Sequence, residues 1–190
     1  YLKKFALPDA EGNYTLTFLG VASCVDVFVN GKYVGYSEGS HNTAEFDITD
    51  KLVQGENEIV AVVHKWCTGT YLECQDMFRN NGIFRDVYIT KTGINSVYDI
   101  EIKTKRREDG AYLLDLLPVF KIADEVFFEA VIKDGDNLIA ERSLKICPGK
   151  VDKLTFDVLD VQEWSAEIPK LYDLYICLLY TSDAADDLIG

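Results

Sequence analysis

The 190-residue chain has no long apolar run and few basic residues, and each shortage excludes a class of protein. No stretch approaches the roughly 18 uninterrupted apolar residues of a membrane-spanning helix. The 32 Asp and Glu outnumber the 19 Lys and Arg, for a net charge of −13. Because such an acidic surface repels phosphate backbones and anionic lipids, we expect no nucleic acid and no membrane as partners. A neutral ligand such as a sugar remains compatible.

The cysteines and histidines are too scattered to predict a metal centre. None of the five cysteines forms a Cys-x-x-Cys pair, and the only two histidines, His41 and His64, lie far apart, so a zinc site is not expected. Neither histidine has a neighbouring Ser or Cys arranged as a triad, which favours structural or surface roles. An odd number of widely spaced cysteines is typical of reduced thiols, so we expect a cytoplasmic protein.

Alternation of apolar and polar residues with a period of two runs through most of the chain and predicts an all-β fold. Residues 91–93 read as a linker between two series of short strands, which predicts two β-sandwiches. Asn30-Gly31 predicts a tight hairpin turn, and residues 55–57 predict a second turn. The expected strands are residues 13–18, 25–30, 32–36, 45–48, 58–66, 83–90, 96–104, 111–120, 126–134, 137–143, 151–158 and 171–178.

Residues 67–81 follow neither the two-residue period of a strand nor the 3.6-residue period of a helix, which predicts a long loop. A long loop inside a compact domain is often functional. The wider segment 69–86 combines acids with aromatic residues. Carboxylates accept hydrogen bonds from sugar hydroxyls, and aromatic faces cover the apolar faces of a sugar ring. Residue chemistry alone favours a binding role and a structural role equally for Asp76. For Arg85 and Asp86 it favours structural ion pairing.

A hydrolytic carboxylate pair is an alternative hypothesis for the same segment. Glu73 with Asp76, or Asp76 with Asp86, would have to lie at the separation that glycoside hydrolysis requires. Spacing within a loop does not determine that separation, and 32 acids make chance pairs common. We therefore disfavour this alternative.

Several stretches together resemble the bacterial β-galactosidases of glycoside hydrolase family two. Residues 27–36 (VFVNGKYVGY), 44–49 (AEFDIT) and 55–63 (GENEIVAVV) resemble the sugar-binding jelly roll of the family, which β-glucuronidases and β-mannosidases share. Residues 66–87 (WCTGTYLECQDMFRNNGIFRDV) are more specific and resemble the β-galactosidase branch. Residues 164–172 (WSAEIPKLY) resemble the end of the immunoglobulin-like domain that follows the jelly roll.

This resemblance covers residues 1–176 and implies an arrangement of domains. It implies part of a galactose-binding-like jelly-roll sandwich over residues 1–92 and an immunoglobulin-like β-sandwich over residues 93–176. Residues 177–187 (CLLYTSDAADD) instead resemble a translated sequencing adapter of the transposase type. We therefore expect residues 177–190 to be a non-native tail.

The resemblance also implies an activity for a longer parent protein. In that family two glutamates of a later TIM barrel hydrolyse terminal β-galactosides, such as lactose, by a retaining mechanism, so we expect no catalytic residue here. Asp76 matches the family's Gln-Asp-Met aspartate, which binds sodium and helps hold the galactose 6-hydroxyl. Sodium and magnesium are the implied cofactors, a galactoside is the implied substrate, and the parent is expected to be a homo-oligomer. Cys74 and Phe78 depart from the Asp and Trp that relatives often carry.

Residues 1–8 (YLKKFALP) resemble a strand well inside the jelly roll and carry neither an initiating Met nor the features of a signal peptide. We therefore expect an internal fragment that lacks the first jelly-roll strands, with an open core, poor stability of the first domain and no activity of its own. A stand-alone carbohydrate-binding module and a structural two-sandwich protein are the competing hypotheses. A parent that acts on other glycosides, such as glucuronides or mannosides, also stays open.

Overall fold

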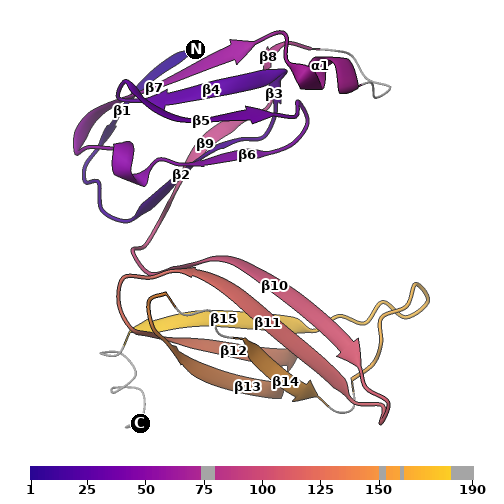
Figure 1. Cartoon of the computed structure of the whole chain (residues 1–190). Helices are drawn as coiled ribbons and strands as arrows, with labels where there is room; N and C mark the ends of the chain where they lie inside the picture. The colour runs from indigo at the N-terminus through magenta and orange to yellow at the C-terminus, as the bar shows by residue number, and fades with distance from the viewer. Residues whose placement is uncertain (74–79, 150–152, 159–160, 181–190) are drawn as a thin grey trace. The chain divides into compact units, whose positions relative to one another are not determined.

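The computed structural model describes residues 1–73, 80–149, 153–158 and 161–180, and most of these residues lie in β-strands (Figure 1). The chain divides into two compact units, Tyr1–Gly93 and Ile94–Gly190, each with its own apolar core. The predicted all-β fold is confirmed. Among the described residues, no helix has the length and apolar character needed to cross a membrane.

The first unit is a sandwich of two antiparallel sheets with a short two-stranded ribbon (Figure 1). The larger sheet has the order β1-β7-β4-β5, the smaller has the order β6-β2-β9, and the ribbon pairs β3 with β8. The elements are β1 (Leu2–Leu7), β2 (Asn13–Phe18), β3 (Val21–Ala22), β4 (Cys24–Val29), β5 (Lys32–Glu38), β6 (Ala44–Asp47), η1 (Thr49–Lys51), β7 (Gly55–His64), α1 (Thr68–Leu72), β8 (Gly82–Ile83) and β9 (Val87–Thr92).

Alternate residues of facing strands fill the core of this unit. Val25, Val27 and Val29 of β4 are fully buried and belong to the same apolar cluster as Leu16 and Phe18 of β2. Successive side chains of a strand point to opposite faces, so the period of two in the sequence becomes one buried and one outer face. Burial of such side chains contributes roughly 25 cal/mol per Å² of apolar surface removed from water, which is the main stabilisation of the sandwich.

The Asn30-Gly31 hairpin is confirmed. Both residues have positive φ, 50° for Asn30 and 74° for Gly31, as a two-residue turn between β4 and β5 requires. The Asn30 side chain also accepts a hydrogen bond from the Glu58 backbone N–H (2.9 Å) and donates to the Asn57 side chain (2.8 Å). The predicted turn at residues 55–57 is wrong, because β7 already begins at Gly55 and pairs with β1 from there.

The stretch expected as a plain loop, residues 67–81, contains the short helix α1. Its start is held locally, since the Cys67 backbone N–H donates to the Thr70 hydroxyl at 3.1 Å. A single turn of helix is too short to leave a 3.6-residue period in the sequence, which explains why the pattern did not predict it.

The predicted strand 83–90 is divided in two. β8 ends at Ile83 and β9 begins at Val87, because the chain between them crosses from the ribbon to the smaller sheet. The Phe84 backbone N–H donates to the Gly20 carbonyl (3.3 Å), and the Leu19 N–H donates to the Asp86 carbonyl (3.0 Å). Alternation of residue types carries no signal for such a change of partner strand.

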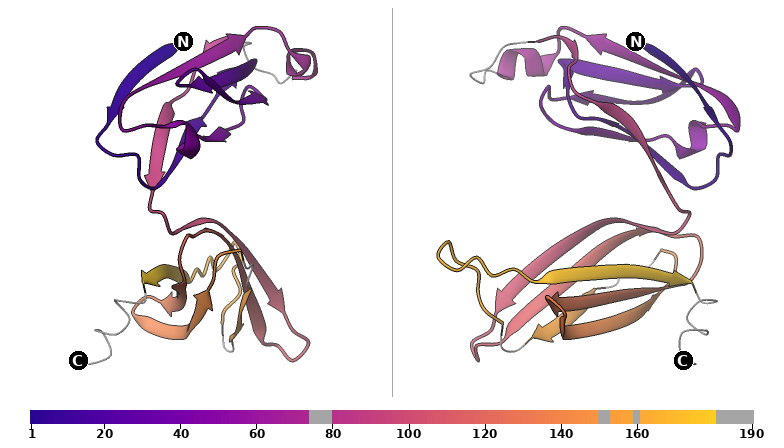
Figure 2. Two further views of the ribbon diagram at one scale, coloured as in Figure 1. Left: turned by 60° about the vertical axis from the view of Figure 1, so that its left-hand side comes forward. Right: turned by 180° about the vertical axis from the view of Figure 1, so that it is seen from behind.

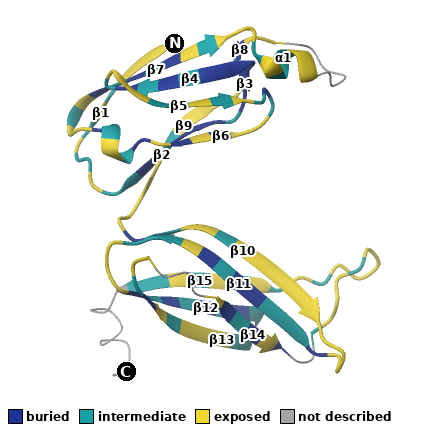
Figure 3. Cartoon of the chain, in the orientation of Figure 1, coloured by how far each residue is buried: buried dark blue, intermediate teal, exposed yellow. Residues whose placement is uncertain are grey.

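The second unit is a sandwich of two three-stranded antiparallel sheets, β10-β11-β14 and β13-β12-β15. Figure 3 shows its buried residues on strands of both sheets. Fully buried Leu116, Phe128 and Phe156 belong to its core. The strands are β10 (Ser96–Arg106), β11 (Tyr112–Lys121), β12 (Val126–Asp134), β13 (Asn137–Ile146), β14 (Leu154–Val158) and β15 (Asp173–Tyr180).

The last strand runs further than the resemblance implied. β15 continues past Ile176 to Tyr180, and Cys177 lies opposite Glu129 in the ladder with β12. Leu178 packs against the core of the second unit. The first residues of the expected tail therefore extend a strand, since Cys177 to Tyr180 continue the ladder with β12. Residues 181–190 lie outside the described residues.

A groove opens onto the core of the first unit, while the expectation that further jelly-roll strands are missing stays a prediction. The groove has a volume of about 490 Å³ and lies between β1 and β9. Tyr1, Leu2 and Phe5 line it at or just before β1, and Val87 and Ile89 line it on β9. β1 and β9 are each the outermost described strand of their sheets. The core residues that also line the groove are Leu16, Phe18, Ile59 and Ala61.

We predict that residues 1–90 expressed alone are only marginally stable. Leu2 and Val87, which line the groove, are 62% and 40% exposed, and among the described residues β1 is an outermost strand of its sheet. Thermal unfolding followed by circular dichroism should show a broad transition at low temperature. A sharp cooperative melt of residues 1–90 would contradict the prediction, and residues 94–180 melted in parallel provide the comparison.

Candidate functional site

The candidate site lies at the end of the first unit where the chain leaves β7 and returns through β8. Between these strands stand α1 and residues 74–79, and the latter lie outside the described residues. The views in Figure 2 show α1 projecting beyond the ends of the sheets. We call residues 65–73 the outgoing arm and residues 80–86 the returning arm. Each arm is held to the sandwich by its own set of polar contacts.

Glu38, at the end of β5, holds the outgoing arm. One carboxylate oxygen accepts a hydrogen bond from the Gly69 backbone N–H at 3.0 Å, and the other accepts from the Tyr36 hydroxyl at 2.7 Å. The Tyr36 hydroxyl, followed by the Gly69 N–H, lowers the pKa of Glu38 because both stabilise the ionised carboxylate. The carboxylate therefore ties α1 to the larger sheet.

Glu73 holds the same arm at the far end of α1. Its carboxylate accepts a hydrogen bond from the Ser40 backbone N–H at 3.0 Å, and its own backbone N–H donates to the Gly69 carbonyl at 2.7 Å. The half-buried Glu73 is therefore engaged with backbone at the point where the described arm ends. This contact gives Glu73 a structural role. The carboxylate pair that includes Glu73 was the disfavoured alternative.

Two aromatic side chains of the outgoing arm face solvent. The rings of Trp66 and Tyr71 stack at a centroid distance of 6.2 Å, and they are 62% and 76% exposed. The Lys65 ammonium lies 5.5 Å from the Trp66 ring. An exposed aromatic surface next to an acidic loop is a combination that sugar binding uses. Tyr71 belongs to the segment 69–86 for which sugar binding is predicted, whereas Trp66 precedes it.

Arg85 and Phe84 hold the returning arm. The Arg85 guanidinium donates to the carbonyls of Leu19 and His41, both at 3.3 Å, and lies over the Phe84 ring. The His41 ring packs against Phe84 at 5.3 Å. Arg85 therefore has the predicted structural role, but its described hydrogen bonds go to backbone carbonyls, whereas acids were expected as partners.

Asp76, the predicted binding residue, lies outside the described residues together with Cys74, Phe78 and Arg79. Its binding role stays a prediction, and the disfavoured alternative of a carboxylate pair with Glu73 or Asp86 is not tested. His64 pairs with Asp26 at 3.0 Å on the outer face of the larger sheet. Within the described part of the chain, no three His, Cys, Asp or Glu side chains gather closely enough to hold a metal ion.

Residue patterns did not identify Glu38, Tyr36 and Ser40 as residues of this site. All three lie in or directly after β5, about 30 residues before α1 in the sequence. On a strand with a period of two, exposed Glu38 and Tyr36 are indistinguishable from ordinary surface residues. They become part of the site only because residues 69–73 lie beside the end of β5, where Gly69 binds Glu38 and Glu73 binds Ser40.

The second unit has a groove of about 420 Å³ with a different character. Its lining is mostly apolar, and several of its polar groups bind one another: the Tyr112 hydroxyl is hydrogen-bonded to Glu163, and the Gln162 backbone N–H donates to the Tyr172 hydroxyl (2.8 Å). A sugar site requires free hydrogen-bonding groups. This groove is therefore a weaker candidate than the loop end of the first unit.

We predict that the contact between Glu38 and α1 is lost in acid. Because the pKa of Glu38 in the folded chain lies below its ordinary value of 4.5, the contact is complete above that pH. It is lost as the pH falls through the lower, folded pKa. The Gly69 amide proton in an NMR titration should shift upfield over that range. In the Glu38→Gln variant, the pH-dependent change of the Gly69 amide shift should vanish. If the change persists in this variant, it reports the titration of another group.

Comparison with known proteins places these features in a family. The family model described as "Glycosyl hydrolases family 2, sugar binding domain" matches residues 1–93. A β-galactosidase of Actinobacillus pleuropneumoniae is 38% identical over 96% of the chain, and one of Staphylococcus xylosus is 40% identical over 93%. The chain spans 17% of the length of each of these two relatives.

Solved structures share the fold. A β-glycosidase of Bacteroides vulgatus matches 95% of the chain with a TM-score of 0.75 and 18% identity, covering 24% of its own chain. A β-glucuronidase of Bacteroides uniformis matches 95% with a TM-score of 0.77 and 19% identity, also covering 24% of its own chain. The sequence relatives and the match to residues 1–93 together show that the chain belongs to glycosyl hydrolase family 2, and that its first unit is the family's sugar-binding domain.

Proposed function

We propose that the chain is a non-catalytic part of a β-galactosidase and that its first unit supplies a substrate-binding loop to an active site located elsewhere in the longer protein. The observation that carries the proposal is the segment 66–87, which resembles β-galactosidases and lies in a chain 38–40% identical to two of them. In this proposal the parent hydrolyses terminal β-galactosides by a retaining mechanism with two glutamates.

The anchoring of the two arms supports a binding role for the loop. Glu38 and Glu73 hold the outgoing arm, and Arg85 holds the returning arm, so residues 74–79 start and end at backbone that is tied to the sandwich. A group that positions a substrate has to be held by its surroundings, because small displacements of a bound substrate cost large factors in rate. Asp76 lies in the middle of this segment.

Asp76 is the residue that we propose to contact the substrate. A carboxylate can accept a hydrogen bond from a sugar hydroxyl and can ligate a hard cation such as sodium. We propose that it orients the 6-hydroxyl of a galactoside. The described residues form no metal-binding cluster, so the sodium proposal rests on the resemblance at Asp76. Magnesium and a homo-oligomeric parent are further proposals from the resemblance. A cytoplasmic location is a proposal from the number and spacing of the cysteines.

The proposal predicts that Asp76→Asn impairs the longer protein in a way that depends on the 6-hydroxyl. For a nitrophenyl β-galactoside, kcat/KM should fall about 100-fold, as when one oriented hydrogen bond to a reacting substrate is lost. For the matching 6-deoxygalactoside the same substitution should have little effect, because the partner hydroxyl is absent. Steady-state kinetics with both substrates measures the difference.

Asp86→Asn is the matched control, since Asp86 is an exposed acid on the returning arm of the same loop. It should leave both substrates within about threefold of the parent. An equal loss for the two substrates in Asp76→Asn would sink the role of the 6-hydroxyl. Faster turnover of a glucuronide than of a galactoside by the unmodified protein would favour a β-glucuronidase instead.

We further predict that the purified 190-residue chain does not hydrolyse galactosides, because the proposed catalytic glutamates lie outside it. A chromogenic β-galactoside incubated with the chain is the assay, and turnover above a buffer control would refute the prediction. Binding of galactose by the chain without turnover would instead support the alternative of a stand-alone carbohydrate-binding module.

A further inference from the structure

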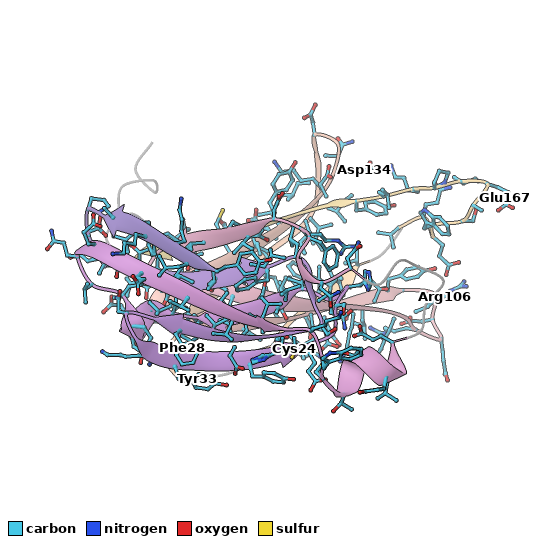
Figure 4. The ribbon with its side chains drawn as sticks, turned by 90° about the horizontal axis from the view of Figure 1, so that it is seen from above. Cys24, Phe28, Tyr33, Arg106, Asp134 and Glu167 are labelled. Atoms are coloured by element: carbon cyan, nitrogen blue, oxygen red, sulfur yellow. The ribbon has the colours of Figure 1, made fainter. Side chains whose placement is uncertain are left out.

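Two cysteines that are 43 positions apart meet at the base of α1. Cys24 is the first residue of β4, and Cys67 directly precedes α1. Figure 4 labels Cys24 near the helix. Both residues carry free thiols. Cys67 and the Tyr36 hydroxyl are the side-chain neighbours that act on the thiol of Cys24.

The backbone brings these thiols together independently of their own contact. Cys24 lies opposite His64 in the ladder between β4 and β7. Its neighbour Ser23 donates from its backbone N–H to the His64 carbonyl (3.0 Å) and from its hydroxyl to the Lys65 carbonyl (3.1 Å). The chain therefore passes directly beside Cys24 two residues before it reaches Cys67.

Glu38 provides a second link on the other side of Cys24. It lies opposite Cys24 in the ladder between β4 and β5, and its carboxylate accepts the Gly69 N–H at 3.0 Å. A Cβ on Gly69 would stand 3.4 Å from that carboxylate and 3.5 Å from the Cys67 sulfur. Cys24, Glu38 and Cys67 thus form one cluster around the start of α1.

The two thiols differ in access to solvent. Cys24 is 2% exposed, whereas Cys67 is half-buried. Burial raises the pKa of the Cys24 thiol, and the neighbouring Cys67 raises it further. A small reagent therefore reaches Cys67 first, and Cys24 is positioned to react only with what is attached to Cys67. This arrangement is that of an attacking thiol and a resolving thiol.

We propose that Cys24 and Cys67 are a modification site that a low-molecular-weight disulfide converts reversibly into an intramolecular disulfide bond between β4 and the start of α1. The inference rests on the described residues and does not depend on the proposed substrate.

The reaction proceeds in two exchanges. The Cys67 thiolate attacks one sulfur of the small disulfide, so that a mixed disulfide forms and one small thiolate leaves. The Cys24 sulfur then attacks the Cys67 sulfur of the mixed disulfide, the second small thiolate leaves, and it takes the proton of the Cys24 thiol. Two protein thiols are oxidised, and one small disulfide is reduced to two thiols. An excess of small thiol reverses both steps.

The test uses the full chain with Cys74, Cys147 and Cys177 replaced by Ser, so that only the two thiols in question remain. The chain is incubated with oxidised glutathione, quenched in acid and digested with trypsin without reduction. We expect the peptide of residues 5–32 to be linked to that of residues 66–79, and both thiols to be lost together. Dithiothreitol should restore both, and the oxidised chain should melt at a higher temperature than the reduced one.

The matched control keeps Cys67 and Cys147 but replaces Cys24, Cys74 and Cys177 by Ser. Cys147 is a half-buried thiol of the second unit that contacts Glu125, so this variant also has two thiols. It should stop at mixed disulfides with glutathione. Circular dichroism verifies folding, and trimethylamine N-oxide raises the folded fraction where needed.

Two results would overturn the proposal. One is a lasting mixed disulfide on Cys67 with Cys24 still reduced. The other is a link between Cys24 and Cys67 that forms no faster in the folded chain than in concentrated urea. In a chain that retains all five cysteines, a link from Cys67 to Cys74 in preference to Cys24 would also count against it.

Discussion

The antiparallel ladder between β4 and β7 is the constraint on which the loop end of the first unit depends. β4 contributes three fully buried valines to the core, so the position of this strand is determined by packing as well as by its hydrogen bonds. The ladder pairs Val29 with Ile59 at one end and Cys24 with His64 at the other. Because pairing stops at His64, the chain has to leave the sheet there, directly beside the end of β5.

Carboxylate groups serve as acceptors for backbone N–H groups at this end of the unit. Outside the sheets the chain has donors without strand partners, and such donors have to be satisfied by side chains, other backbone or water. Glu38 accepts from Gly69, and Glu73 accepts from Ser40. On the returning arm the polarity is reversed, since the Arg85 guanidinium donates to two carbonyls. Part of the acidic excess of the chain thereby has a structural use.

The second unit has a buried acid within a sheet, and the partners of this acid are side chains. Asp115 of β11 is buried, and it accepts a hydrogen bond from the Thr155 hydroxyl (2.8 Å) and pairs with the Lys153 ammonium (2.7 Å). Lys153, followed by Thr155, lowers the pKa of Asp115 because both favour the ionised form. A buried charge is tolerated only with such partners, so this pair joins β11 to β14 without leaving an unpaired carboxylate.

The sequence by itself determined the all-β class, the Asn30-Gly31 hairpin and most strands, because alternation and turn chemistry are local properties. Its motifs also identified the family. Only the tertiary structure revealed that the strand expected over 83–90 is divided, that α1 interrupts the expected loop, and that Glu38, Glu73 and Arg85 hold that loop. It alone placed Cys24 beside Cys67. The helix α1 is held locally but is too short to leave a period in the sequence. The other features arise from contacts between residues about 30 to 70 positions apart, which no local pattern encodes.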